Sequence, residues 1–270
     1  MSPRWRDELR LLLTPQRAAL QRFARGLRRA PVQRAQLDAA PGAALDWTPA
    51  LEALGALLAA APARGADATV IVSSHFVRYG LVPASELLVT QEDEVRFARH
   101  NFMRVHGAAA EHWSVRVSPG DGTAQDGGLA SGMEQALVDA LRALLERHGL
   151  RPRALQPALM AAFNHARLAL PAGGCRLIVH EPGIAVSALL APGWRRVRSQ
   201  RVAEPAAEAL AQLLEREQVL EDEAPADVPI CLLPLLPLAQ PLPAAPGAAP
   251  HLLEAFWPES AQGAPERSAA

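Results

Sequence analysis

Apolar residues along this chain follow two periods, and each period predicts a different kind of element. Alternation of apolar and polar residues, interrupted by turn residues, is typical of strands and hairpins. The segment 69–73 instead begins with four β-branched residues in a row, which indicates a central strand covered on both faces. The strands predicted from these patterns are a hairpin over 9–26, single strands over 32–37, 69–73 and 113–117, a second hairpin from Cys175, and a buried strand over 228–233.

Leucine-rich stripes at helical spacing predict amphipathic helices between these strands. Thr48 and Pro49 are expected to supply the cap and first turn of one helix, and Thr90 with Asp93 forms a capping-box pattern that opens another. The second of these helices is expected to bury Val105 and to end at Gly107. The predicted helices cover residues 48–62, 90–107, 129–148, 158–170 and 204–219.

Strands that alternate with helices predict an α/β fold, and the recurring order of hairpin, helix and strand indicates two similar halves. The chain changes character at Pro234, because residues 234–270 are rich in proline and alanine and are expected to be a disordered tail. One apolar patch, 251–257, stands out within it. Either this patch folds back onto the domain, or Phe256 and Trp257 dock onto a partner.

The composition limits the classes of protein to which this chain can belong. The chain has 270 residues, of which half are apolar, so it can bury a sizeable core as one large or two small domains. It contains no apolar run of 18 residues and no signal-peptide pattern at its start, which predicts a cytoplasmic protein. Its two cysteines, Cys175 and Cys231, are expected to be buried thiols.

Charge is distributed unevenly. The sequence contains no lysine, which excludes a Walker, Schiff-base or kinase-type lysine. Residues 1–34 hold nine arginines and two acids, whereas 204–227 hold eight acids and one arginine. These segments are either solvated faces, or the basic N-terminal segment contacts anionic lipid headgroups or an acidic partner. A net charge of −1 and 4% aromatic residues give no support to nucleic-acid binding.

The two hairpin turns are candidate phosphate sites that lack the usual residues. Backbone N–H groups cradle phosphates where glycines allow a close approach, whereas proline removes an N–H donor. The first turn reads Thr14-Pro15-Gln16 and the second Glu181-Pro182-Gly183. Glu181 and Gly183 remain weak candidates for a nucleotide or a hydrated cation, and the alternative is that Glu181 is a surface turn acid. These turns favour a scaffold over a catalyst.

Three other segments are candidates for chemistry. Arg78 and Tyr79 follow the predicted central strand, where α/β sheets often place function, so they are partner-binding candidates or else a packing turn. The glycine-rich stretch 127–132 either binds an anion at a helix start or is a plain loop. His75 beside Ser73 suggests a nucleophile and base, but no Gly-x-Ser-x-Gly elbow is present. No catalytic or metal-ligating residue is therefore expected.

Several phrases in the sequence match a known family in pattern and length. They are VIVSSHFVRYGLVP, LVDALRALLERHGLRPRALQPALMAAFNHARLAL and CRLIVHEPGIAVSALLAPGWRRVRSQRV. In these phrases the chain resembles the actin-like PilM-type proteins of type IV pilus assembly and the cytoplasmic domains of type II secretion L-type proteins. The resemblance implies a two-lobed actin-like fold, duplicated from a ribonuclease H-like unit, over 1–233. The lobes are expected at about 1–120 and 121–233, before the tail at 234–270.

The resemblance also implies a function. Family members that bind nucleotide carry an Asp-Ile-Gly type turn in the first hairpin, and this chain has Thr14-Pro15-Gln16 there. The resemblance, together with this difference in the first turn, therefore predicts a non-catalytic adaptor without a cofactor, located in the cytoplasm or at the face of the inner membrane. A short cytoplasmic peptide of an inner-membrane assembly protein is expected to lie in a groove between the lobes. The alternative is an actin-like ATPase or kinase-type enzyme that uses Mg-ATP with atypical phosphate loops around Glu181 and Gly183.

Overall fold

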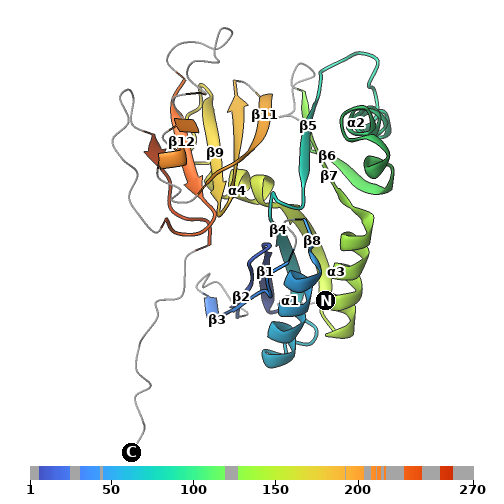
Figure 1. Cartoon of the computed structure of the whole chain (residues 1–270), viewed down its shortest axis with the longest axis vertical. Coiled ribbons are helices and arrows are strands. Elements are labelled where there is room, and N and C mark those ends of the chain that lie inside the picture. Colours follow the sequence, from blue (N-terminus) through green and yellow to red (C-terminus); the bar gives the residue numbers. More distant parts are fainter. Residues whose placement is uncertain are drawn as a thin grey trace, which may run out of the picture.

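The computed structural model shows two α/β lobes with a smaller β-sheet insertion beside them (Figure 1). The chain forms most of the first lobe, then the insertion, and completes the first sheet before it enters the second lobe. The residues that the structure describes are 6–24, 31–42, 45–118, 127–191, 193–203, 208–210, 212–213, 216, 228–238 and 250–257.

The first lobe is built on a five-stranded sheet with the order β3-β2-β1-β4-β8. Its first three strands form an antiparallel meander, and β1 pairs in parallel with β4, which pairs in parallel with β8. Its strands are β1 (Glu8–Leu13), β2 (Arg17–Phe23), β3 (Pro31–Asp38), β4 (Asp67–Val72) and β8 (Arg151–Pro157).

Both faces of this sheet are covered, as the continuous apolar run of β4 predicts. Val70 and Val72 point into a core shared with helices α1 (Thr48–Ala60) and α3 (Gln135–Arg147). Ile71 points to the opposite face, where it packs with residues of helix α4 (Ala158–Ala166). Successive strand residues thus serve two cores, and the expectation of a central strand is confirmed.

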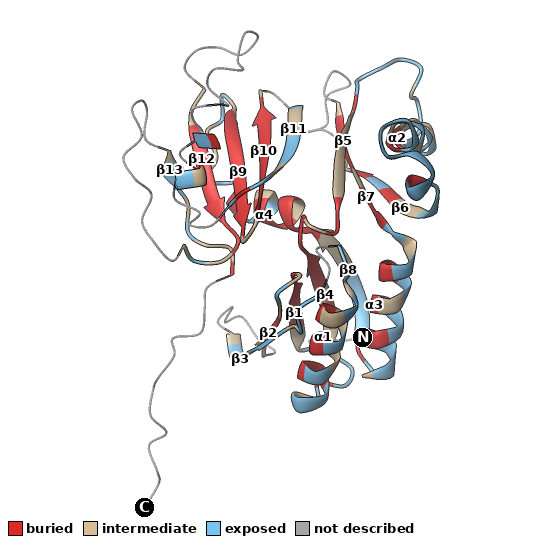
Figure 2. Ribbon diagram, in the orientation of Figure 1, coloured by how far each residue is buried: buried red, intermediate tan, exposed pale blue. Residues whose placement is uncertain are grey.

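The second lobe repeats this arrangement with the order β11-β10-β9-β12-β13. A meander of three antiparallel strands again pairs in parallel with the next strand, so the predicted duplication is confirmed. Every residue of β9 and β10 is buried (Figure 2). The strands are β9 (Cys175–Glu181), β10 (Ile184–Leu190), β11 (Trp194–Arg201), β12 (Ile230–Pro234) and β13 (His251–Leu252).

A three-stranded antiparallel sheet is inserted between β4 and α3. Its order is β5-β7-β6, and helix α2 with the short helix η1 covers it. The elements are β5 (Arg78–Val82), α2 (Gln91–His106), η1 (Gly107–His112), β6 (Trp113–Ser118) and β7 (Gly128–Glu134). Figure 1 shows this insertion beside the second lobe, with β5 lying against β11.

The expectation of one helix over 129–148 is wrong in its first part. Residues 128–134 form β7 between two partner strands, and the helix starts at Gln135. Gly132 explains the difference, because a Cβ there would lie 2.9 Å from the Trp113 ring and 3.2 Å from the Phe102 ring. The backbone must approach these rings closely. The glycine-rich stretch 127–132 therefore forms most of strand β7 and offers no helix N-terminus to an anion.

The lobe boundary and the tail also differ from the expectation. The first sheet is completed by β8, so the chain crosses into the second lobe after Pro157 and not near residue 120. Within the expected tail, residues 250–257 extend the second sheet: β13 pairs in parallel with β12. Trp257 is 5% exposed and packs on the face of the first sheet that α4 covers. The fold-back alternative for 251–257 is thus confirmed, and Trp257 is not a free docking residue.

Two further expectations lie mainly outside the described residues. In the predicted acidic helix, residues 208–210, 212–213 and 216 are helical, and Leu210 and Leu213 are buried. In the basic N-terminal segment, Arg22 lies 2.6 Å from Asp7 and Arg17 lies 3.0 Å from Asp38. The described part of that segment therefore has acidic partners within the fold. Its contact with a membrane remains a prediction.

The two cysteines are free and buried, as expected. Cys175 on β9 and Cys231 on β12 lie in the same core, and the neighbouring Cys231 side chain together with burial raises the pKa of the Cys175 thiol. No helix among the described residues is both long and apolar enough to cross a membrane.

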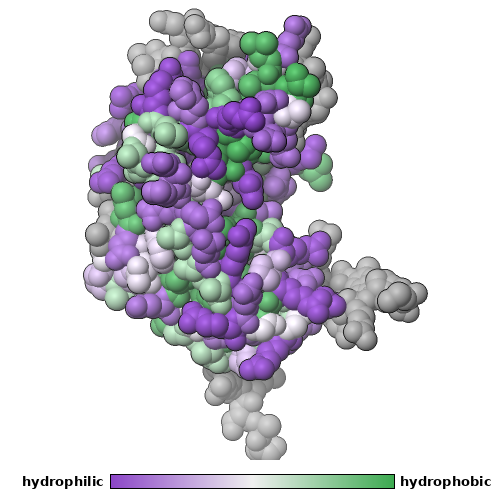
Figure 3. All heavy atoms as spheres, turned by 90° about the vertical axis from the view of Figure 1, so that its right-hand side faces the viewer, coloured by the Kyte–Doolittle hydropathy of each residue, from purple (hydrophilic) through white to green (hydrophobic). Residues whose placement is uncertain are grey.

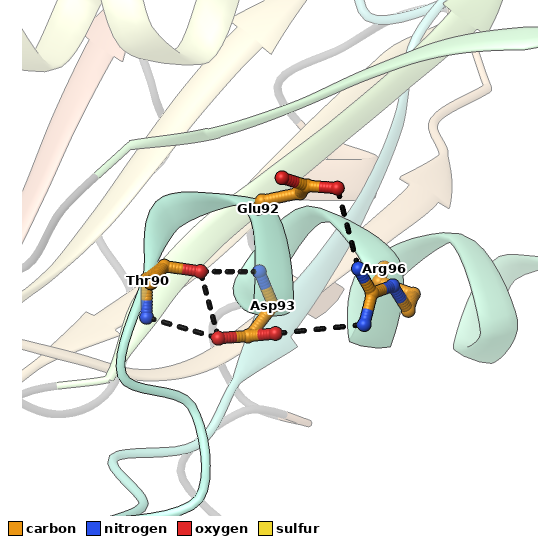
Figure 4. A network of polar contacts seen from close by, with 4 residues as sticks. All are labelled: Thr90, Glu92, Asp93 and Arg96. Atoms are coloured by element: carbon orange, nitrogen blue, oxygen red, sulfur yellow. Dashed lines mark hydrogen bonds and ion pairs between the residues drawn. The ribbon is translucent and has the colours of Figure 1, made fainter.

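Helix α2 begins with the predicted capping box. The Asp93 N–H donates to Thr90 Oγ1 at 3.2 Å, and the Thr90 N–H donates to Asp93 Oδ2 at 3.1 Å (Figure 4). The Thr90 hydroxyl also donates to Asp93 Oδ2 at 2.7 Å, and this bond together with the one from the Thr90 N–H holds the pKa of Asp93 below its ordinary value. Arg96 adds ion pairs to Glu92 and Asp93 one turn later. The inward face is shorter than expected, because Val105 is 66% exposed.

Thr90→Ala should lower the free energy of unfolding by about 1 kcal/mol, because it leaves the Asp93 N–H without its acceptor. Thr48→Ala is the matched control. Thr48 was expected to cap α1, but the cap position is Trp47, whose side chain makes no capping bond, and the Thr48 N–H donates to Asp46 Oδ1 at 2.9 Å. The control should cost a few tenths of a kcal/mol. Urea denaturation of both variants measures the difference, and equal losses would contradict the capping role of Thr90.

Candidate functional site

The two lobes meet where β4 ends, and a buried carboxyl joins them. Glu181 is the last residue of β9 in the second lobe, and Ser73 and Ser74 directly follow β4 in the first. The Ser74 N–H donates to Glu181 Oε1 at 2.9 Å, and Ser73 Oγ donates to Glu181 Oε2. Both serines and the glutamate are at most 1% exposed. A single side chain of the second lobe therefore satisfies two donors of the first.

Glu181 is not the surface turn acid that was the alternative at the sequence level. Its burial raises the pKa of the carboxyl above the ordinary value of 4.5, although the bonds from Ser73 and Ser74 act in the opposite direction. Each carboxyl oxygen already accepts a hydrogen bond from the chain. The residue expected to be a weak cation or nucleotide ligand is thus part of the contact between the lobes.

The turn after Glu181 is held by His75 from the first lobe. His75 Nε2 lies 2.9 Å from the carbonyl oxygen of Pro182, and the Val202 N–H donates to the Gly183 carbonyl at 3.1 Å. Gly183 has φ +83°, a left-handed conformation in which a residue with a side chain is strained. It therefore serves the geometry of this turn, and a Cβ there would lie 3.4 Å from the His75 ring.

Gly183→Ala should lower the free energy of unfolding by about 1–2 kcal/mol, since it forces an alanine into a left-handed conformation. The control is Gly173→Ala, where an added Cβ meets no atom within 4 Å and φ is not positive. That variant should leave stability unchanged or raise it slightly. Thermal melting of the two variants side by side tests this, and a neutral Gly183→Ala would show that the turn relaxes.

Tyr79 lies inside the inter-lobe contact and not in a loop. It belongs to β5, and its hydroxyl lies 3.2 Å from Ser74 Oγ and accepts a bond from the Leu159 N–H at 3.4 Å. Leu159 is in the first turn of α4, whose N–H groups have no partner within the helix. Burial raises the pKa of this phenol. The only tyrosine of the chain thus connects β5, the end of β4 and the start of α4.

The first hairpin turn is also held by a side chain within it, the Thr14 hydroxyl. Thr14 is 3% exposed, its Oγ1 donates to the Arg17 carbonyl at 3.0 Å, and the Arg17 N–H donates back to Oγ1 at 3.1 Å. The turn between β1 and β2 is therefore closed by a side chain. Pro15, at its centre, has no N–H to offer.

A groove of about 510 Å³ opens beside the second turn, between the insertion and the second lobe. Arg78 and Tyr79 from β5 form one part of it, so both partner-binding candidates line a surface depression. Arg78 Nη1 donates to the carbonyls of His75 and Val77, at 3.0 Å each. The remaining lining residues are Leu45, His75, Val105, His106, Gly183, Ile184, Ser199, Gln200 and Arg201.

The groove is basic. Burial lowers the pKa of Arg78, and the like charge of Arg201 across the groove lowers it further, while Glu134 acts in the opposite direction. The pKa of His106 is lowered by partial burial and by Arg78. Among the described residues, neither Arg78 nor Arg201 forms an ion pair, so the field in the groove is not neutralised by a contacting acid.

The pairing of the Ser73 hydroxyl with the His75 ring, which the sequence suggested as a nucleophile with its base, does not form. Ser73 Oγ donates to Glu181 and accepts a bond from the His75 backbone N–H at 3.2 Å, while the His75 ring faces Pro182. No group of three or more histidines, cysteines or acids in the described part of the chain could hold a metal. The described residues thus provide hydrogen bonds between the lobes and, in the groove, guanidinium groups that attract anions.

Ser73 and Ser74 are the functional positions that sequence reasoning missed, because a serine near a histidine suggests only a nucleophile with its base. A signal was present: two hydroxyl residues follow a strand whose second half is wholly apolar. Their partner lies 107 and 108 residues further along the chain, so no local pattern links them to Glu181. Phe256, expected as a docking residue, packs edge-on against the His165 ring at 5.2 Å.

The chain matches no family model, and it matches no curated protein. Its structure is similar to the cytoplasmic domain of EpsL, an inner membrane component of the type II secretion system of Vibrio cholerae. That match has a TM-score of 0.59 and 12% identity, over 94% of this chain and 89% of the other.

Two further solved structures are similar. The PilM-PilN type IV pilus biogenesis complex matches with a TM-score of 0.61 and 16% identity, over 86% and 81% of the two chains. A Bacteroides thetaiotaomicron protein with an actin-like ATPase fold and unknown function matches with a TM-score of 0.56 and 11% identity, over 87% and 83%. The duplicated sheets and these three matches show that the chain has the actin-like ATPase fold.

Proposed function

We propose that this protein is a non-catalytic adaptor of an inner-membrane assembly for secretion or type IV pili. It works at the cytoplasmic face of the membrane and holds a short peptide of a membrane partner. The EpsL and PilM likenesses support this assignment through the shared fold. The groove between the insertion and the second lobe is the proposed place for the peptide, because it is open and large enough for several side chains.

One observation supports the non-catalytic part of the proposal. The Glu181 carboxyl accepts the hydrogen bonds of the two donors between the lobes, the Ser73 hydroxyl and the Ser74 N–H. In the actin-like family the second hairpin contributes to phosphate binding, and here Ser73 and Ser74 donate to the chain's own acid in that region. A phosphate would have to displace this carboxyl and would meet Pro182, which has no N–H. The lobes are thereby joined without a nucleotide.

Site-specific photocrosslinking in the native cells tests the partner. A benzophenone amino acid in place of Val105, which lines the groove and is 66% exposed, should crosslink to an inner-membrane component of a secretion or pilus assembly. The control places it at Leu168, which is fully exposed and does not line the groove. Mass spectrometry identifies the products. Absence of any membrane protein at position 105, or the same products from position 168, would contradict the proposal.

A further inference from the structure

We propose that the groove between the insertion and the second lobe binds an extended acidic segment of a partner protein, whose carboxylates pair with Arg78 and Arg201. This inference rests on the proposed adaptor function and adds the chemistry of the partner.

Two arginines line the same groove, and neither forms an ion pair with an acid in the described part of the chain, although the charge of Glu134 acts on Arg78 without contact. Arg78 is oriented by its bonds to the His75 and Val77 carbonyls, so its guanidinium is fixed before any ligand arrives. Arg201 lies close enough to disfavour the charged form of Arg78. A carboxylate bound between them removes this repulsion. Guanidinium groups bind carboxylates through two parallel hydrogen bonds, so the site selects the orientation of a carboxylate as well as its charge.

Strand β11 supplies part of the second-lobe wall of the groove through Ser199, Gln200 and Arg201. Its sequence, WRRVRSQR, contains four arginines and no acid. It is the end strand of the second sheet, hydrogen-bonded to β10, and its other side faces β5 of the insertion. An extended segment can lie in the groove between these two strands, and the positive charge of Arg78 and Arg201 selects one rich in glutamate or aspartate.

An acidic peptide fits the groove better than a phosphate ligand does. The backbone and hydroxyl donors that would cradle a phosphate here, Ser73 Oγ and the Ser74 N–H, are held by Glu181. The remaining groove combines arginines with the apolar side chains of Val105 and Ile184. That mixture suits a peptide that carries acidic and apolar residues together. Figure 3, which views the molecule from the side of α2, shows apolar groups set among hydrophilic ones on that face.

The test uses the full chain and a fluorescein-labelled octapeptide of glutamates with one central leucine. Binding is followed by fluorescence anisotropy at about 50 mM salt, and it should weaken steeply at about 0.5 M salt. Arg201→Gln should weaken it about tenfold, the loss expected for one charge-assisted hydrogen bond. Arg78→Gln should do the same. Since Arg78 also bonds two carbonyls, the exposed Arg201 is the variant on which the result depends if Arg78→Gln unfolds.

The matched control is Arg142→Gln, which removes the same charge from an exposed position of α3 outside the groove and should leave binding unchanged. A peptide with glutamine in place of every glutamate should not bind. Equal binding to Arg201→Gln and Arg142→Gln, or equal binding of the glutamine peptide, would overturn the inference. Displacement of the glutamate peptide by inorganic phosphate at low millimolar concentration would overturn it as well and assign the site to a phosphate ligand.

The peptide experiment and the crosslinking experiment fail independently. If position 105 crosslinks to a membrane assembly protein but the pure protein does not bind the glutamate peptide, the acidic-segment inference is wrong and the adaptor function stands. If the peptide binds with the expected dependence on Arg201 but no membrane protein is crosslinked, the inference stands and the membrane assignment is wrong.

Discussion

Replacing Trp257 with alanine should lower the free energy of unfolding by about 3–5 kcal/mol, because the change empties a large buried volume. Trp257 packs against Leu12 and Ile71 of the first sheet, and its backbone N–H donates to the Leu235 carbonyl at 2.8 Å. It therefore joins the end of the described chain to the first lobe. Removing the indole leaves a cavity at that contact, which the surrounding strands cannot fill.

Leu252→Ala is the control for this variant. Leu252 lies five residues earlier on β13 and is 59% exposed, so its truncation should cost less than about 0.5 kcal/mol. Guanidinium denaturation of the three proteins measures both effects. A loss below about 1 kcal/mol for Trp257→Ala would show that residues 250–257 do not contribute to the folded core.

Replacing Glu181 with alanine should lower the free energy of unfolding by about 3 kcal/mol. The change leaves the Ser73 hydroxyl and the Ser74 N–H buried without their acceptor, and each orphaned donor costs about 1–3 kcal/mol. The control is Glu86→Ala, an exposed acid in the loop before α2, which should be nearly neutral. If both variants melt at the wild-type temperature, the carboxyl does not hold the lobes together.

Glu181→Gln tests the same contact through pH. The pKa of the carboxyl is raised in the folded state, so its contribution to stability is complete below the unfolded value of about 4.5 and declines as the pH rises through the folded pKa. Glutamine does not titrate and can both accept from Ser74 and donate to Ser73. The stability of Glu181→Gln relative to wild type should therefore increase from about pH 4.5 upward. A relative stability that is constant with pH, or that decreases, would contradict the raised pKa.

Local patterns predicted much of this fold. The β-branched run of β4, the capping box at Thr90 and the helix end at Gly107, which has φ +68°, all depend on neighbours within a few residues. The element predicted wrongly was β7. Leu129 and Met133 continue the four-residue spacing of the apolar face of α3. A prediction from periodicity alone therefore merged this strand and the helix into one helix.

The candidate site was harder to predict because its contacts are long-range. Glu181 reaches serines more than one hundred residues earlier, and Tyr79 meets the start of α4 from 80 residues away. The sequence did indicate that proline-containing turns are poor phosphate sites. It gave no sign that the second turn's own acid would fill the space between the lobes, because that depends on how the two halves are placed.

Thermal melting with and without saturating Mg-ATP tests most directly whether the lobes are joined by Glu181 without a nucleotide. A ligand that binds only the folded state adds about 2.7 kcal/mol at a hundredfold excess over its dissociation constant. In a domain of this size that would raise the melting temperature by roughly 5 to 10 °C. We expect no shift. A shift of that size, abolished by Gly183→Ala but not by Gly173→Ala, would contradict the nucleotide-free contact and favour the actin-like ATPase or kinase-type enzyme.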